Sequence, residues 1–315
     1  WAEKPLEAVS RLKLAQAFGA AAAILLGQGK KEIMRSWEEE PEQGIILRRP
    51  PAIDPATYEA AIEDYQKNIR ALASNGKGPA VIVCAQAANL MGWPPAAESF
   101  PPSFTENDRR SALAALKKAG ELTQAKRFQD AADLLEKERG LRPGYAPISF
   151  ELGRARAGIF EIENQDGSSA GPELDATRQK TLADFKRALD EEARAVISHR
   201  APPELNRALR EAANEVGLLF FDTEKIMDEA GRPAPGFDLF DDHCHPNLVG
   251  QQIIAQALFK FLSEKLPSFP AAQAKPAPWD EKAFLAEQKV DADFLHHVNL
   301  TLGIFMGLKM RFPDR

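Results

Sequence analysis

The sequence contains little that would cross-link the chain, anchor it in a membrane or draw it to nucleic acid. Only 2 of its 315 residues are cysteines, Cys84 and Cys244. This excludes a disulfide framework and leaves the compartment open, and we expect both thiols to be unpaired. No apolar run reaches the roughly 20 residues of a membrane-spanning helix, and the most apolar stretch, 15–26, is expected to be a buried helix. Lys and Arg number 40 against 46 Asp and Glu, a formal charge of −6, so no basic excess favours nucleic acid.

Residues 54–85 are predicted to form a helix followed by a strand. Asp54-Pro55 predicts a helix start with Asp54 as N-cap, and the helix is expected to end near Ser74, before a glycine-rich turn. Segment 79–85 is short, apolar and rich in β-branched residues, which predicts a strand buried on both faces. The loop beyond it, with Trp93-Pro94-Pro95, is either the wall of a ligand pocket or a stiff packed corner.

A second helix–strand pair follows much later, at 205–216 and 217–221, and Thr223 is expected to cap the next helix. Buried strands alternating with helices are typical of a parallel sheet. The predicted fold class is therefore α/β, a partial parallel sheet flanked by helices.

The residues between these two pairs, 107–203, are charged and helical in period, with no strand signal. Ala131, Leu135 and Pro143 have the spacing of the second helix of a tetratricopeptide repeat, and Leu152-Gly153 fits the next first helix at a 34-residue period. The segment thus resembles a tetratricopeptide-like module, which implies a surface for a protein partner. An ordinary inserted helical hairpin is the open alternative.

Near the end of the α/β pattern lies a run, 238–250, that combines acids, imidazoles and a helix start. Asp242 and His245 stand three residues apart, and Pro246 is expected to open the helix that follows. A carboxylate can fix the tautomer and orientation of a nearby imidazole while the imidazole takes a proton from a nucleophile. Asp242 and His245 are therefore the candidate catalytic residues.

The block Asp242-x-x-His245-Pro246-Asn247 resembles the last sequence block of the SGNH (GDSL-type) hydrolases, whose catalytic Asp and His also lie three apart. The order of helices and strands supports this resemblance over about 1–110 and 200–265. It implies an SGNH-like α/β sheet and hydrolysis of an acyl ester, with a small ester or an acylated carbohydrate as substrate. The resemblance implies no cofactor.

Other parts of that family's site are missing from the sequence. No Gly-Asp-Ser nucleophile block occurs, and no Gly-x-Ser-x-Gly motif either. Asp166-Gly167-Ser168 has the wrong order and falls within the helical segment, and Asn89 lacks the Gly-x-Asn setting of the family's oxyanion-hole residue. We expect the missing blocks ahead of residue 1, so that this chain is the C-terminal portion of a hydrolase.

Metal binding is a rival interpretation of the same run, because five consecutive residues are of ligand type. They cannot all converge on one ion, and no second ligand cluster occurs elsewhere in the sequence, so no metal is predicted. The five residues are Asp241, Asp242, His243, Cys244 and His245.

A different class of function stays open, a non-catalytic module that binds a protein partner through its helices on an α/β scaffold. The expected organisation is the same for both. Residues 1–106 and 204–266 form the two parts of the α/β domain, 107–203 the inserted helical module, and 267–315 a linker and helical tail.

Overall fold

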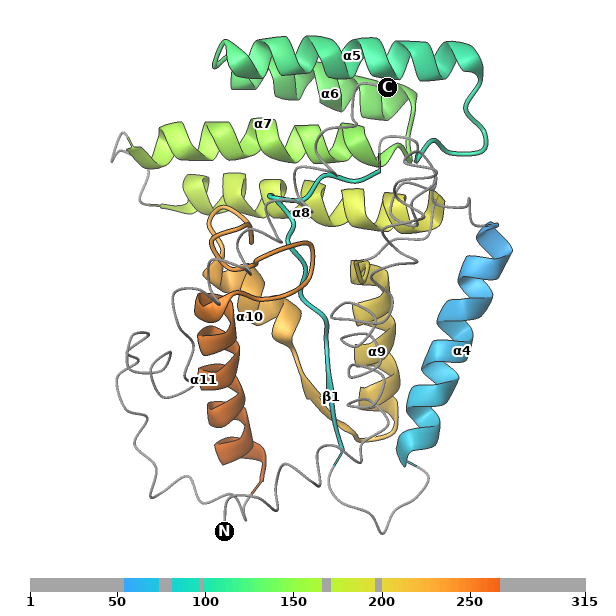
Figure 1. Cartoon of the computed structure of the whole chain (residues 1–315), viewed down its shortest axis with the longest axis vertical. Coiled ribbons are helices and arrows are strands. Elements are labelled where there is room, and N and C mark those ends of the chain that lie inside the picture. The colour runs from blue at the N-terminus through green and yellow to red at the C-terminus, as the bar shows by residue number, and fades with distance from the viewer. Residues whose placement is uncertain (1–53, 74–80, 97–98, 166–170, 196–199, 267–315) are drawn as a thin grey trace, which may run out of the picture. The chain divides into compact units, whose positions relative to one another are not determined.

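The structure is a computed structural model that describes residues 54–73, 81–96, 99–165, 171–195 and 200–266, all within one compact unit of the chain (Figure 1). These residues form a helix-rich α/β arrangement with one two-stranded parallel sheet. The helix expected at 15–26 and the tail 267–315 lie outside the described residues.

Helix α4, Pro55–Ala73, begins as predicted. The carboxylate of Asp54 accepts a hydrogen bond from the backbone N–H of Thr57 at 3.0 Å, which caps the first turn, and Pro55 occupies the first helical position. Helix α9, Pro203–Glu215, lies beside α4, and an ion pair of 2.9 Å between Arg70 and Glu215 links the two helices (Figure 1).

The sheet pairs β1, Ile82–Cys84, with β2, Leu219–Phe221, in parallel, so the prediction of a parallel sheet is confirmed. Val83 is buried against apolar side chains of α4 and α9. The prediction that this strand is buried on both faces is wrong, because Cys84 is exposed. Successive side chains of a strand point to opposite faces, and within the described residues α4 and α9 cover only the face of Val83.

The chain continues from β2 into helix α10, Thr223–Ala230, and later into α11, Leu248–Lys265. The predicted cap of α10 was one residue late. The carboxylate of Asp222, and not the hydroxyl of Thr223, accepts the N–H of Lys225 at 3.1 Å, since a cap must precede the first helical residue. Helix α11 packs on the sheet through Phe261, whose ring lies 5.3 Å from that of Phe221.

Four helices make up the segment predicted to be helical: α5, Glu106–Gln124; α6, Phe128–Leu141; α7, Ala146–Gln165; and α8, Pro172–Ala195. They are stacked in succession, so that α6 packs on α5 and α7, and α7 packs on α8 (Figure 1). We call these four helices the helical module. Its apolar core contains the residues singled out in the sequence, Ala131, Leu135 and Leu152, which are fully buried.

Helix α8 joins the module to the rest of the described chain. Its Phe185 packs against Phe150 of α7, and both belong to an apolar cluster with Ala88 and Leu90, which follow β1. Lys186 of α8 adds an ion pair of 2.9 Å with Glu224 of α10. The module is therefore in direct contact with the segments that come after both strands.

Candidate functional site: an aspartate–histidine dyad

Asp242 and His245 lie on a loop, 236–247, that turns back on itself before α11. We call it the dyad loop. Phe240 and Pro246 form an isolated antiparallel bridge, and the N–H of Asp241 donates to the carbonyl of His245 at 2.9 Å. This bridge closes a tight turn around residues 241–245. The two candidate residues are thereby placed at the tip of the turn.

The end of the dyad loop is fixed to the start of α11. Pro246 does not open the helix as expected, because it is engaged in the bridge with Phe240. Asn247 is the N-cap instead, and its side-chain oxygen accepts the N–H of Gly250 at 3.0 Å. A side chain at Gly250 would collide with the carbonyl of Leu239, so only glycine permits this close approach.

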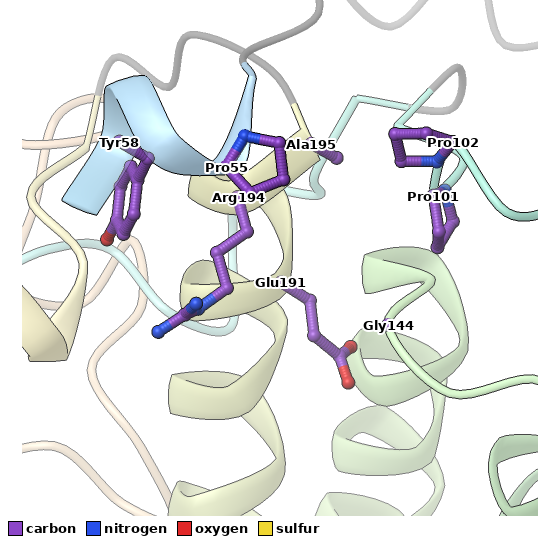
Figure 2. A pocket seen from close by; sticks show the side chains of 8 residues that line it. All are labelled: Pro55, Tyr58, Pro101, Pro102, Gly144, Glu191, Arg194 and Ala195. Carbon is purple, nitrogen blue, oxygen red and sulfur yellow. The ribbon is translucent and has the colours of Figure 1, made fainter.

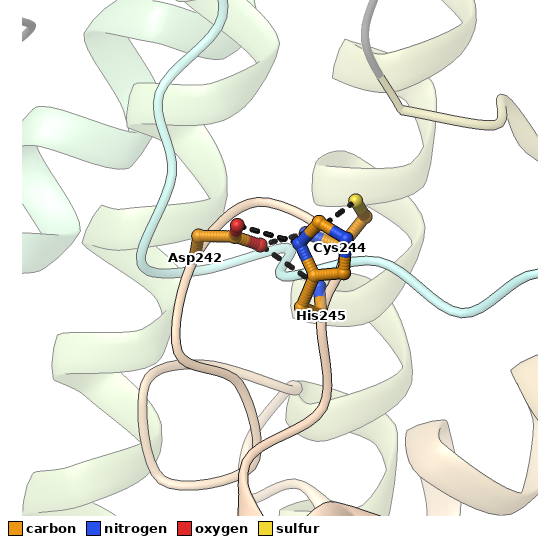
Figure 3. Close-up of side chains that lie close together, drawn as sticks. All are labelled: Asp242, Cys244 and His245. Carbon is orange, nitrogen blue, oxygen red and sulfur yellow. Dashed lines mark hydrogen bonds and ion pairs between the residues drawn. The ribbon is translucent and has the colours of Figure 1, made fainter. Parts of the chain in front are cut away.

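The structure brings the side chains of Asp242 and His245 into direct contact (Figure 3). One carboxylate oxygen, Oδ2, lies 2.6 Å from Nδ1 of His245. The other, Oδ1, accepts the backbone N–H groups of Cys244 and His245, each at 2.8 Å. The carboxylate is thus held by three hydrogen bonds, two of them from the backbone of its own turn. Its orientation toward the imidazole is set by local structure.

The charge state of Asp242 follows from these contacts. The residue is 9% exposed, and burial by itself raises the pKa of its carboxyl. The hydrogen bonds from Cys244 and His245, together with the nearby His243 imidazole, outweigh burial and hold the pKa below its usual value. Asp242 is therefore an ionised carboxylate at neutral pH and can only accept hydrogen bonds.

One nitrogen of the His245 imidazole is hydrogen-bonded to Asp242, and the other is exposed. Because Asp242 accepts only, Nδ1 of His245 must be the donor, and the neutral ring then carries its lone pair on Nε2. The His245 side chain is 71% exposed, and no group in the described part of the chain hydrogen-bonds Nε2. An oriented imidazole with a free, basic Nε2 is the arrangement that general-base catalysis requires.

Cys244 lies between the two residues in sequence, but the imidazole does not activate it. Its Sγ is 3.8 Å from Nδ1 of His245, the nitrogen already committed to Asp242. Burial, followed by the negative charge of Asp242, raises the pKa of the thiol to about 11. The thiol is protonated at neutral pH, whereas cysteine nucleophiles act as thiolates. Cys244 is therefore not the attacking group.

Asp242, Cys244 and His245 are also close enough together to be considered for a metal ion, with their ligand atoms within 4.8 Å of one another. Two ligands with metal bonds of about 2.0 Å in a tetrahedral zinc site would lie roughly 3.3 Å apart. The 2.6 Å between Oδ2 and Nδ1 is instead a hydrogen-bond distance. The geometry fits the dyad better than a metal centre.

The loop after β1 proves to be a packed support for the dyad. Trp93 is 4% exposed, and its ring lies 5.3 Å from that of His243, which fits the interpretation of this loop as a stiff packed corner. Sequence reasoning missed the role of Asn89, which is fully buried and donates from Nδ2 to the carbonyl of Asp242 at 2.9 Å. The signal was available: an amide side chain in an apolar run directly after a strand needs buried partners.

A separate pocket of about 210 Å³ lies at the junction of α4, α8 and the segment before α5 (Figure 2). Apolar groups line most of it, among them Tyr58, Pro101 and Pro102, and Arg194 and Glu191 of α8 border it. No residue of the dyad loop contributes to its lining. The dyad lies outside this pocket, with Asp242 buried and the His245 side chain exposed.

Comparison of the chain with family models, curated proteins and solved structures finds no match. The fold and the site themselves therefore describe the class of protein: it is a helix-rich α/β protein with an aspartate–histidine dyad. Among the described helices, none is long and apolar enough to span a membrane.

Proposed function

We propose that this chain supplies the acid–base half of a serine ester hydrolase of the SGNH (GDSL-type) class. The observation that carries the proposal is the state of one side chain. His245 has Nδ1 bonded to an ionised Asp242 at 2.6 Å and Nε2 exposed without a partner in the described residues. The Asp-x-x-His-Pro-Asn block in which this pair lies supports the assignment to this class.

The proposed reaction uses each nitrogen of His245 for a separate task. Nε2 accepts the proton of a serine hydroxyl as its oxygen attacks the acyl carbon of the ester, and Asp242 stabilises the imidazolium that forms. The imidazolium then gives this proton to the leaving alkoxide as the ester C–O bond breaks. Water repeats the sequence on the acyl-enzyme and releases the acid. A small ester or an acylated carbohydrate is the proposed substrate.

The serine is proposed to come from a segment outside the 315 residues, because they contain no Gly-Asp-Ser block. Two features near the dyad leave room for additional structure. Within the described residues β1 has a neighbouring strand on one side only, and a two-stranded sheet is rarely stable without more strands or covering helices. Most apolar residues of α11 are only partly buried, and only Gly250 is fully buried. Further parallel strands beside β1 would cover these surfaces.

The test uses the full-length gene product. Its coding sequence ahead of Trp1 is expected to contain Gly-Asp-Ser, and the protein is expected to hydrolyse an aryl acetate and to be labelled on that serine by a fluorophosphonate. His245→Ala should lower both activities by at least about a thousandfold. His243→Ala, which removes the neighbouring imidazole and its contact with Asp242, should lower labelling far less than His245→Ala. Labelling that survives His245→Ala would remove His245 from the mechanism.

A non-catalytic interaction module is the second candidate, and the helical module favours it. Each of its helices packs on the next, the arrangement found in stacked helical repeats that bind peptides or proteins. On this proposal the sheet is only a scaffold, and the dyad is a structural turn. Two results together would favour the interaction module over the hydrolase. The coding sequence ahead of Trp1 would contain no Gly-Asp-Ser, and partner binding would be unchanged by His245→Ala.

A further inference from the structure

Asn89 hydrogen-bonds the main chain of the dyad loop from a buried position. It is fully buried in the loop that follows β1. Its Nδ2 donates to the carbonyl of Asp242 at 2.9 Å, and its backbone N–H donates to the carbonyl of His243 at 3.0 Å. Its side-chain oxygen accepts the N–H of Gly92 at 2.8 Å. One residue thus fixes two successive carbonyls of the dyad loop.

Arg200 fixes Asn89 in turn. The guanidinium is 4% exposed, and its Nη1 donates to the carbonyls of Asn89, at 3.1 Å, and Trp93, at 2.7 Å. Its Nη2 donates to Glu192 of α8 at 2.9 Å. The other oxygen of Glu192 accepts the N–H of Ala96 at 2.8 Å. The loop after β1 is therefore fixed by hydrogen bonds to Glu192, near the C-terminal end of α8.

These contacts form one continuous buried chain from the helical module to the dyad. It runs from Glu192 through Arg200 and Asn89 to the carbonyl of Asp242, and every member is at most 9% exposed. A buried ion pair often adds little net stability over an apolar replacement. A fully hydrogen-bonded polar network does, however, specify one geometry, because any displacement leaves a buried polar group without a partner.

We infer that Asn89 and Arg200 are positioning residues of the dyad, through which the helical module holds the Asp242 carboxylate against His245. This inference rests on the proposed function. Neither residue is a catalytic residue, because both are buried and their described polar contacts are with protein groups. In particular, the Asn89 amide is committed to Asp242 and Gly92.

Asn206 provides a matched control for Asn89. It is also buried, at 3%, and also makes two side-chain bonds to the loop after β1. Its oxygen accepts the N–H of Gln86 at 2.9 Å, and its Nδ2 donates to the carbonyl of Gln86 at 2.8 Å. It makes no described hydrogen bond to the dyad loop. Asn206→Ala thus removes a comparable pair of bonds nearby without touching the dyad.

The experiment uses the full-length gene product, labelled uniformly with ¹⁵N so that both imidazole and backbone nitrogens are observed, at a pH where the imidazoles are neutral. Two quantities are measured: the share of the Nδ1-protonated tautomer of His245, and the hydrogen-exchange rates of the Cys244 and His245 amides. In the unaltered chain the Nδ1-protonated form should predominate. Asn89→Ala should reduce it and speed exchange of both amides at least about tenfold. Asn206→Ala should change neither the tautomer share nor the exchange rates, even if it lowers Tm as much as Asn89→Ala does.

A second variant keeps the inference testable if Asn89→Ala does not fold. Arg200→Lys retains the buried positive charge beside Glu192, but one ammonium cannot reproduce the fork that reaches two carbonyls and a carboxylate. It should shift the same two measurements in the same direction. Equal effects of Asn206→Ala, or unchanged values in both Asn89→Ala and Arg200→Lys, would overturn the inference.

The outcome also separates this inference from the proposed function. If His245 in the unaltered chain is not in the Nδ1-protonated form, the dyad itself is wrong, and the proposed hydrolase fails with it. If that form is present and does not respond to Asn89→Ala or Arg200→Lys, only the positioning role fails. In the full-length enzyme, Asn89→Ala should lower kcat for an aryl acetate while KM stays within about twofold.

Discussion

The helical module and the dyad loop are stabilised by different kinds of contact. The module buries a continuous apolar core between regular helices, with Leu135 and Leu152 fully enclosed. The dyad loop contributes only Leu239 and Phe240 to a small apolar cluster and is held mainly by hydrogen bonds to single atoms. Apolar packing depends on volume and tolerates adjustment, whereas a hydrogen bond depends on the position of one donor and one acceptor.

This difference predicts that stability and site geometry respond to different substitutions. A change in the module away from Glu192, the residue of α8 that contacts Arg200, should lower the free energy of unfolding and leave the imidazole as it is. A change in the dyad loop should alter the imidazole even where little stability is lost. The tautomer of His245 and the free energy of unfolding, measured on the same variants, test whether the two regions are separate in this sense.

The largest loss of stability is expected in the module, at Asp184 of α8. Its carboxylate is 3% exposed and pairs with Arg139, at 2.6 Å, and with Arg156. Asp184→Ala leaves two largely buried guanidinium groups without this partner and should reduce the free energy of unfolding by about 3–5 kcal/mol, measured by urea denaturation. The His245 tautomer should not change.

The control for this substitution is Glu121→Ala on α5. It breaks an exposed pair with Lys118, with an N–O distance of 3.2 Å, and should cost at most about 1 kcal/mol. If Asp184→Ala shifted the His245 tautomer as strongly as it shifts stability, the ion pairs of the module and the dyad loop would belong to one cooperative structure.

A smaller loss with a pH dependence is expected at Asp242. Asp242→Asn keeps the shape of the side chain but places an amide against Nδ1, so it should cost about 1–3 kcal/mol at neutral pH and favour the other tautomer of His245. The pKa of Asp242 is lower in the folded chain than its ordinary value. Its carboxylate therefore contributes stability above the unfolded value of about 3.9, and this contribution is lost as the pH falls through the folded pKa.

The stability difference between the unaltered chain and Asp242→Asn should accordingly shrink as the pH falls below about 4. Urea denaturation at a series of pH values measures it. The same series with Asp175→Asn, an exposed carboxylate in the first turn of α8, provides the reference. A difference that grows below about pH 4 would mean that the carboxylate is not stabilised in its ionised form.

The sequence predicted the regular elements better than the contacts between them. The cap at Asp54, the helices of the module and the parallel pairing of the two strands follow from local patterns, and the structure confirms them. The prediction that β1 is buried on both faces was wrong. Burial depends on which elements cover a strand, and the residue pattern of the strand does not encode this. The approach of Asp242 to His245 could be expected from three-residue spacing. The position of Asn89 indicates that its amide needs buried partners, but its actual partner lies 153 residues away and follows only from the tertiary fold.

The smallest effect is expected from a pair of helix caps, one in each region. Thr105 caps α5 in the module, and Asn247 caps α11 at the end of the dyad loop. Thr105→Ala and Asn247→Ala should each cost about 1 kcal/mol by thermal or urea unfolding. Only Asn247→Ala should also speed amide exchange at His245, because its Nδ2 donates to the carbonyls of Phe237, at 3.3 Å, and Asp238, at 3.1 Å.

Asn247→Asp distinguishes these two roles of the side chain. An aspartate can still accept the N–H of Gly250 and is favoured at a helix N-terminus, so the stability of α11 should be retained. It cannot donate to Phe237 or Asp238, so exchange at His245 should remain fast, as in Asn247→Ala. If Asn247→Asp restored slow exchange as well, the cap alone would order the dyad loop, and the loop would then depend on the same local helix energetics as the module.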